Sequence, residues 1–233
     1  MFGFFTKENR GMKGEKMVAR KLKKLPGSRY LLLNDIMLEN SYGTTQIDHI
    51  VVSVHGIFVI ETKNYIGNIY GNDYYAQWIQ EINGRKYDFH NPVKQNYAHV
   101  KAVQNLLHIR YKDIIPMIVF ADVKEKCWFD VECANPVLHR KQLKKYMTKN
   151  YREIIFSPEQ MLEFAQEILE ADITSGRNKR GHIRAIKHRI KQDRKYLARN
   201  RCPRCGAKLH YRRWSHRSVK ECHNAGCGFI MHV

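Results

Sequence analysis

No apolar run in this 233-residue chain is long enough to cross a bilayer. The longest such stretch, Ile50 to Ile60, is interrupted by Ser53, His55 and Gly56. The opening residues MFGFFTKENR also lack the basic segment and apolar segment of a secretory signal. A chain that is 43% hydrophobic and 27% charged can nevertheless bury a core, which excludes disordered and fibrous classes. We therefore expect a cytoplasmic protein that does not bind membranes.

Acidic residues are scarce near the C-terminal end of the chain. Residues 175–233 contain 17 Lys or Arg but only 2 Asp or Glu, so they carry +15 of the total charge of +19. Residues 1–174 carry the remaining +4. This asymmetry points to a polyanionic partner, with nucleic acid ahead of a membrane surface. A solvated basic tail without a partner is the alternative.

Internal repeats and low-complexity segments are absent, and the order of the expected elements is that of an α/β protein. Apolar periodicity predicts helices over 11–25, from Asn91-Pro92 onward and over 157–169, and strands over 30–38, 45–54, 56–64 and 115–121. Strands that are apolar on both faces indicate a sheet covered on both sides. Ser175-Gly176 marks a boundary, so we expect units at 1–174, 175–200 (a basic helical linker) and 201–233.

Two acidic residues stand in strands that otherwise contain Ile, Val and Phe, where an unpaired charge is costly. If His55-Gly56 is a two-residue hairpin turn, Ile50 pairs with Glu61 and Asp48 pairs with Lys63. Side-chain alternation then places Asp48, Glu61 and Lys63 on one face of the sheet. A slip of one residue would move Asp48 to the other face, so this arrangement depends on the turn.

Two neighbouring carboxylates repel each other unless a cation lies between them, and oxygen ligands suit Mg²⁺ or Mn²⁺. A metal held in this way supports phosphodiester hydrolysis, with Lys63 stabilising the developing charge or helping to position the water. The alternative is an internal salt bridge between Lys63 and one of the two acids, without a metal.

Several ordered motifs resemble the nuclease-related domain (NERD) family, a branch of the PD-(D/E)xK nuclease superfamily. They are GMKGE (11–15), QIDHIVV (46–52), GIFVIETKN (56–64), Gly67, Trp78 and NPVKQ (91–95). The resemblance implies an α-β-β-β-α-β restriction-endonuclease-like core. It also implies that Asp48, Glu61 and Lys63 are the catalytic signature, with Glu15 assisting the metal site and Gln95 orienting it. Ile47 replaces the proline of the superfamily's name.

The residues themselves leave other interpretations open. Glu15 could be a solvated helix acid, and Gln95 could be a surface or capping residue. In the nuclease interpretation, Glu15, Asp48 and Glu61 hold Mg²⁺. Removing Glu61 is then expected to abolish cleavage, leave binding intact and relieve repulsion between the carboxylates.

Four of the six cysteines lie in the last 32 residues, as C-x₂-C, sixteen residues and C-x₄-C. This spacing predicts a structural Zn²⁺ site at Cys202, Cys205, Cys222 and Cys227, unless His210 or His223 replaces one thiolate. The remaining two, Cys127 and Cys133, share one face of an expected strand and are interpreted as packing residues.

The segments CPRCGAKL and CHNAGCGF resemble the zinc ribbon at the C-terminus of bacterial type IA topoisomerases. That resemblance implies binding of single-stranded or distorted DNA. Basic and aromatic side chains that could contact phosphates and stack on bases are Arg204, Lys208, Tyr211, Arg212, Arg213, Trp214, Arg217 and Lys220. A ribbon that docks another protein is the alternative.

Together these features predict a Mg²⁺- or Mn²⁺-dependent nuclease acting on DNA, single-stranded or branched, in DNA processing or repair. A non-catalytic adaptor that uses a nuclease-like fold to bind nucleic acid is the competing hypothesis. The choice between DNA and RNA, the mode of cleavage and the oligomeric state stay open.

Overall fold

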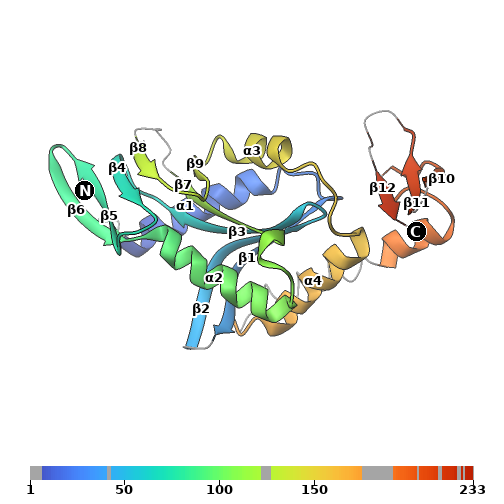
Figure 1. The fold of residues 1–233 in the computed structure, drawn as a ribbon, viewed down its shortest axis with the longest axis horizontal. Coiled ribbons are helices and arrows are strands. Elements are labelled where there is room, and N and C mark those ends of the chain that lie inside the picture. Colours follow the sequence, from blue (N-terminus) through green and yellow to red (C-terminus); the bar gives the residue numbers. More distant parts are fainter. Residues whose placement is uncertain are drawn as a thin grey trace.

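The computed structural model describes residues 7–40, 43–121, 127–174, 191–203, 205–214, 217–224, 227 and 229–232 (Figure 1). Most of the expected basic linker, residues 175–190, lies outside this part of the chain. Residues 191–198 of the linker are helical, as expected.

A five-stranded sheet forms the centre of the larger unit, in the order β1-β2-β3-β7-β9. Strands β1 (Tyr30–Asn40), β2 (Gly43–Ser53) and β3 (Gly56–Lys63) form an antiparallel meander. Strands β7 (Ile114–Phe120) and β9 (Val137–His139) extend it in parallel. Helix α1 (Lys7–Leu22) precedes the meander, and α2 (Pro92–Leu107) connects it to β7. The expected α-β-β-β-α-β core is therefore confirmed.

Helices cover both faces of this sheet (Figure 1). On one face, α1 and α3 (Leu143–Asn150) pack against residues such as Phe58 and Met117. On the other, α2 and α4 (Pro158–Ala171) pack against residues such as Ile50 and Val59. This two-sided burial explains why β2 and β3 are apolar on both faces.

A second sheet, in the order β6-β5-β4-β8, lies beside the first; β4, β5 and β6 come between β3 and α2 in the chain, whereas β8 follows β7. It comprises β4 (Gly67–Asn72), β5 (Gln77–Ile82), β6 (Arg85–His90) and β8 (Cys127–Glu132). Buried Trp78 packs with Phe120 of the central sheet. The Asn83-Gly84 turn joins β5 to β6 with φ angles of 51° and 76°, as its sequence indicates. The short helix η1 (Tyr111–Asp113) precedes β7.

Local sequence signals mark two helix starts correctly. Asn91 caps α2 by accepting a bond from the Val93 backbone N–H, and Ser157 forms a reciprocal capping box with Gln160 at α4. Helix α1 instead begins at Lys7, before Gly11, and ends at Leu22. A glycine inside a helix costs only about 1 kcal/mol, which apolar packing along the helix outweighs.

The expected β2–β3 turn is wrong by one residue, which shifts the pairing of the two strands by two. The turn residues are Val54 and His55, because Ser53 pairs with Gly56 and His49 pairs with Ile60. A shift of two preserves side-chain alternation, so Asp48 and Glu61 still meet across the two strands. A shift of one would have separated them.

The C-terminal unit is a small three-stranded sheet of β10 (Leu209–Trp214), β11 (Arg217–Cys222) and β12 (Ile230–His232). Its core contains Leu209, Phe229 and three buried cysteines. In the part of the chain that the structure describes, no helix has the length and apolar character needed to cross a membrane.

Candidate active site

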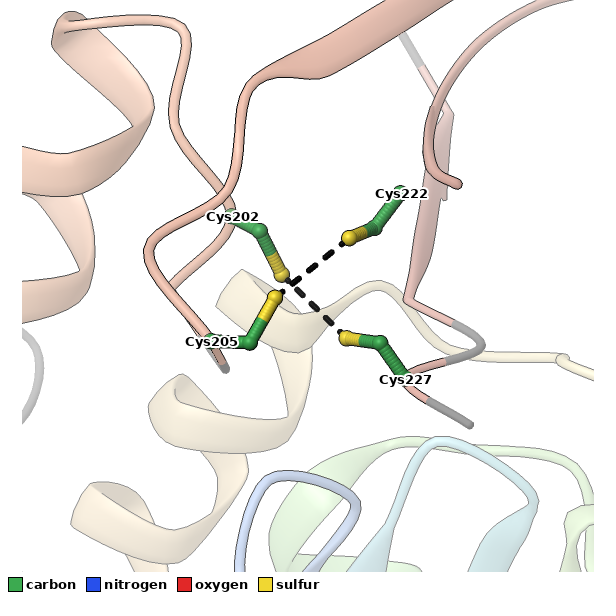
Figure 2. A group of neighbouring side chains, drawn as sticks. All are labelled: Cys202, Cys205, Cys222 and Cys227. Atoms are coloured by element: carbon green, nitrogen blue, oxygen red, sulfur yellow. Dashed lines mark hydrogen bonds between the residues drawn. The ribbon is translucent and has the colours of Figure 1, made fainter. Parts of the chain in front are cut away.

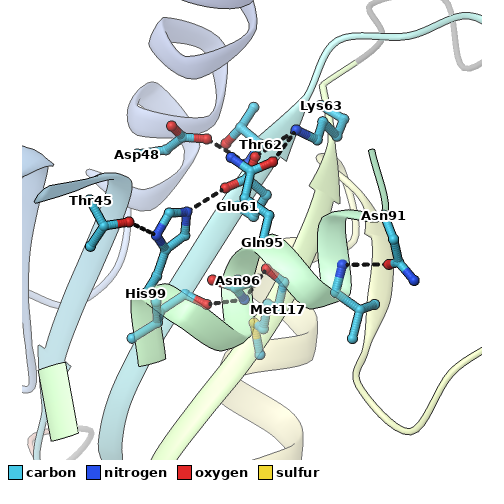
Figure 3. Close-up of polar contacts among 12 residues, drawn as sticks. Thr45, Asp48, Glu61, Thr62, Lys63, Asn91, Gln95, Asn96, His99 and Met117 are labelled. Atoms are coloured by element: carbon cyan, nitrogen blue, oxygen red, sulfur yellow. Dashed lines mark hydrogen bonds and ion pairs between the residues drawn. The ribbon is translucent and has the colours of Figure 1, made fainter. Parts of the chain in front are cut away.

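Lys63 links two of the expected site residues. Its Nζ lies 2.7 Å from Glu61 Oε1 and donates to Gln95 Oε1 at 2.9 Å (Figure 3). Glu61 and Lys63 are two residues apart on β3 and so project from the same face, toward α2. Gln95 lies in the first turns of α2, and its bond to Lys63 means that it is not a free surface residue.

Asp48 lies just beyond the last β2–β3 pair, His49 with Ile60. The strands separate there, and Asp48 Oδ2 accepts a 2.7 Å hydrogen bond from the Thr62 backbone N–H (Figure 3). The side chain thus takes the place of a neighbouring strand's carbonyl. Burial first, and then the charge of Glu61, raise the pKa of Asp48 to about 8. Its ionised form therefore lacks a sufficient counter-charge.

Glu15 reaches the same region from α1, on the other face of the sheet. Burial, then the charges of Asp35 and Glu61, raise the pKa of Glu15. Gly14 allows this close approach, because a Cβ there would lie 2.7 Å from Asn64 Cβ and 3.2 Å from Ala121 Cβ. The Asn64 side chain also donates to the Arg10 carbonyl oxygen at 2.7 Å, which fastens α1 to the end of β3.

Glu61 is the most deeply buried acid of the group, with 2% of its surface exposed. Burial alone would raise its pKa, but the hydrogen bond from His99 and the charge of Lys63 lower it below its ordinary value. Glu61 is therefore well paired, although its charge contributes to the raised pKa values of Asp48 and Glu15. Removing Glu61 would relieve that repulsion but would also leave Lys63 without its counter-charge.

Two polar residues at this site are absent from the sequence-based prediction. His99 Nε2 lies 3.0 Å from Glu61 Oε2, and its Nδ1 lies 2.7 Å from Thr45 Oγ1. Asp35 stands opposite Asp48 in β1, has a positive φ of 54° and accepts from Gln46 Nε2 at 2.6 Å. His99 lies one helical turn after Gln95, but this spacing alone does not distinguish it from a packed histidine. Asp35 can be placed opposite Asp48 only when the pairing of β1 with β2 is known.

His49 lies on the face away from the carboxylates, as alternation predicts, and only 1% of it is exposed. Its Nδ1 is 2.8 Å from Asn34 Oδ1. Burial lowers the pKa of His49 to about 4, so the ring is neutral at pH 7. It is a packed residue rather than a ligand.

The four C-terminal cysteines converge on one point (Figure 2). Their sulfur atoms all lie within 4.8 Å of one another, with Cys202 and Cys227 3.6 Å apart and Cys205 and Cys222 3.5 Å apart. Four sulfurs at 2.3 Å from a tetrahedral zinc ion would be about 3.8 Å apart. The donor set and its geometry therefore fit structural zinc. Within the described residues it is the one group of Cys, His, Asp or Glu ligand atoms gathered this closely.

The expected nucleic-acid contacts are described only in part. Lys208, Tyr211, Arg212 and Arg213 are exposed, and Lys220 pairs with Tyr211 across β10 and β11. Arg204 and the side chains of Trp214 and Arg217 lie outside the described residues. Arg212 also lies 3.5 Å from Glu221. Of the two packing cysteines, Cys133 is partly buried beside Trp78, and the Cys127 side chain is not described.

Comparison with known proteins agrees with the motifs. The family described as NERD, nuclease-related domain, matches residues 10–121, which contain all five expected site residues of the larger unit. A protein of Bacillus anthracis that is named as uncharacterized is 35% identical over 186 residues, covering 78% of this chain and 85% of its own length.

One solved structure, that of a protein of unknown function called AF1548, is 12% identical and covers 78% of this chain and 99% of that protein. The TM-score is 0.27, so this likeness supports no conclusion. The family match and the extent of identity with the Bacillus protein are sufficient to assign the family. The chain belongs to the NERD, or nuclease-related domain, family.

Proposed function

We propose that this protein is a metal-dependent nuclease that hydrolyses phosphodiester bonds in DNA, in DNA processing or repair. The observation that carries the proposal is the meeting of Asp48, Glu61 and Lys63 where β2 and β3 separate, with Gln95 bound to Lys63. An acid from each strand and a lysine beside them are the groups that this chemistry needs.

Glu15, Asp48 and Glu61 would hold Mg²⁺ or Mn²⁺. The raised pKa values of Asp48 and Glu15 support this assignment, because the nearby lysines do not offset burial and the repulsion from other acids, and a bound cation would. Each Glu61 oxygen already has one partner, but a carboxylate oxygen has two acceptor directions and can bind a metal as well. When bound, the ion would polarise a phosphate oxygen and acidify a water molecule.

Besides the metal ion, the site would have the positive charge of the Lys63 side chain. In the proposed reaction its ammonium group stabilises the negative charge that develops on the phosphate, or holds the attacking water. Gln95 accepts from Lys63 and so limits the directions in which the ammonium group can point. Asp48 is held by the Thr62 backbone N–H, which fixes the position of its carboxylate.

The C-terminal unit would contribute affinity rather than chemistry. We assign residues 1–174 to the nuclease-like domain, 175–200 to a basic linker and 201–233 to a zinc ribbon that binds nucleic acid. Exposed basic residues beside Tyr211 support phosphate contacts and base stacking. The linker and ribbon together carry most of the excess positive charge, so binding would fall steeply with salt.

Cleavage of labelled single-stranded, duplex, nicked and branched DNA, and of RNA, tests this proposal. Each substrate is incubated at low salt with Mg²⁺, with Mn²⁺ and with EDTA. The proposal requires cleavage of a DNA substrate that depends on the metal. Cleavage of RNA alone would overturn the assigned substrate, and cleavage of neither in any metal would overturn the enzyme.

One observation favours the competing adaptor. Glu61 is already paired with the charge of Lys63, as in an internal salt bridge, and is hydrogen-bonded to His99. In that case the protein binds nucleic acid through its ribbon without cutting it. Binding of DNA with no cleavage, by wild type and by a Lys63→Met variant alike, would support the adaptor.

A further inference from the structure

A buried chain of polar groups connects β2, α2 and β3 behind the acidic residues. Thr45 Oγ1 lies 2.7 Å from His99 Nδ1, and His99 Nε2 lies 3.0 Å from Glu61 Oε2 (Figure 3). Only 3% of His99 is exposed. The other Glu61 oxygen is held by Lys63, so both ends of this carboxylate have a partner.

The Glu61 carboxylate, at the end of this series of hydrogen bonds, determines which group donates each bond. An ionised carboxylate only accepts hydrogen bonds, so His99 Nε2 must carry a hydrogen. In the neutral imidazole, Nδ1 is then the acceptor, and the Thr45 hydroxyl donates to it. Glu61 thereby selects the tautomer in which His99 donates to it, and the Thr45 hydroxyl, which can donate or accept, adds a hydrogen bond that holds Nδ1. A hydroxyl-free residue at position 45 would remove that bond and leave Nδ1 without this partner.

Attachment of α2 to the sheet does not require His99. Buried Asn96, one turn earlier, donates to the Val59 carbonyl oxygen at 3.0 Å and to the Met117 carbonyl oxygen at 3.3 Å. Val100 and Val103 supply apolar contacts on the same helix. An imidazole buried at position 99 costs desolvation that an apolar side chain would avoid. Its contribution is therefore the bond to Glu61.

We propose that His99 is a positioning residue that fixes the orientation of the Glu61 carboxylate, and that the Thr45 hydroxyl holds the His99 ring in place. This inference rests on the proposed metal-dependent nuclease. Partners that orient a ligating carboxylate typically change metal affinity by about 10–100-fold when they are removed. His99 would act through Glu61 and would not touch the substrate.

Two matched pairs of variants test the inference in the zinc-loaded, full-length protein. His99→Leu removes the donor, whereas His99→Gln keeps an amide nitrogen near the position of Nε2. Thr45→Val removes the hydroxyl, whereas Thr45→Ser keeps it. Mn²⁺ affinity is measured by isothermal titration calorimetry, and the unfolding midpoint of each variant is recorded.

We expect His99→Leu to weaken Mn²⁺ binding by about 10–100-fold, and His99→Gln to recover most of this loss. Thr45→Val should give a smaller loss, and Thr45→Ser should bind as wild type. Equal affinity in His99→Leu and wild type would overturn the inference. So would a loss that glutamine does not recover and that accompanies a lower unfolding midpoint, because the role would then be structural.

A second readout needs neither metal nor cleavage. The ¹⁵N chemical shifts of the His99 ring in the metal-free protein report its tautomer. Hydrogen on Nε2 in wild type supports the inference, and hydrogen on Nδ1 alone overturns it. If wild type binds no Mn²⁺, the proposed nuclease fails, and the ring shifts still decide whether His99 donates to Glu61.

Discussion

Lys63 and Glu61 form a largely buried ion pair in which Nζ lies 2.7 Å from Oε1. The Lys63 side chain is 16% exposed and the Glu61 side chain is 3% exposed. A buried ion pair is stable only when both partners also form further hydrogen bonds. Here Lys63 donates to Gln95, and Glu61 is hydrogen-bonded to His99. Asp48 has no comparable counter-charge, although it lies across the strands from Glu61. The two acids therefore contribute to stability in opposite directions.

Asp48→Asn is expected to stabilise the metal-free protein, and Glu61→Gln to destabilise it. A folded-state pKa raised from 3.8 to about 8 means that Asp48 favours folding below pH 4 and that this contribution is lost as the pH rises through about 8. Asparagine keeps an acceptor for the Thr62 N–H and cannot ionise, so we expect a gain of about 1–3 kcal/mol at pH 8. Glu61→Gln leaves Lys63 without its counter-charge, at a cost of about 1–3 kcal/mol.

Chemical denaturation of both variants at pH 8 with EDTA measures these changes. Asp88→Asn, an exposed acid on β6, is the matched control and should change stability by less than about 0.5 kcal/mol. Destabilisation by Asp48→Asn larger than that of Glu61→Gln would contradict this description of the site.

Acid is expected to destabilise the fold through His49. Its folded-state pKa of about 4 lies below its ordinary value of 6.5, so its contribution is complete above pH 6.5 and is lost as the pH falls toward 4. The reason is burial, since His49 Nε2 has no hydrogen-bond partner among the described residues to stabilise a proton there. The loss amounts to about 3 kcal/mol.

The measurement is the difference in unfolding free energy between wild type and His49→Asn, from pH 7.5 to pH 4. The variant carries a packing penalty that does not depend on pH, and the carboxyl groups titrate in both proteins. The advantage of wild type should therefore shrink as the pH falls. A difference that is constant across this range would show that His49 does not titrate as its burial implies.

Zinc removal is expected to unfold the C-terminal unit alone. Among the described residues, its core holds Leu209 and Phe229 as buried large apolar residues beside the cysteines, with Leu197 partly buried against them, which is too little to fold without a metal. Elemental analysis should find one zinc per chain, and Cys205→Ser should lower this content. Amide NMR signals from 202–232 should collapse in a strong chelator while those of the central sheet persist. A ribbon that stays folded without zinc would contradict the assignment.

The ribbon's basic residues are expected to govern the salt dependence of DNA binding. Arg213→Gln removes an exposed charge from β10, and loss of one phosphate contact lowers the slope of log affinity against log salt by about 0.7–0.9. Lys145→Gln on α3 is the matched control and should leave the slope unchanged. Fluorescence anisotropy with a labelled oligonucleotide from 50 to 300 mM salt measures both. Equal slopes in Arg213→Gln and wild type would remove Arg213 from the interface.

Much of this fold follows from local sequence. Apolar runs locate β1, β2, β3 and β7 to within a few residues, and Asn91 and Ser157 mark helix starts through their side-chain caps. Of the second sheet, the sequence predicts the Asn-Gly hairpin and a strand containing Cys127 and Cys133, but not the pairing that joins them. Strand β8 pairs with β4 across an interval of more than fifty residues, and such pairing leaves no local periodicity.

In the candidate site, too, the sequence predicts some residues and misses others. Asp48 and Glu61 are recognisable because an acid within an apolar strand needs a compensating partner. His99 is harder to find, since histidine in an amphipathic helix packs, caps or binds without a distinctive spacing. Asp35 could be placed only with the pairing of β1 with β2. The β2–β3 turn was misplaced by one residue, and the strand pairing therefore by two, because both His55-Gly56 and Val54-His55 fit a tight hairpin.

The most direct measurement is the initial rate of cleavage of single-stranded and duplex DNA by wild type, Asp48→Asn and the control Asp88→Asn, over a Mn²⁺ titration with an EDTA blank. We expect wild type and Asp88→Asn to cleave at the same metal-dependent rate, and Asp48→Asn to lose at least a hundredfold of that rate while remaining folded and bound to DNA. Cleavage by Asp48→Asn at the wild-type rate, or cleavage that persists in EDTA, would contradict the assignment of this site.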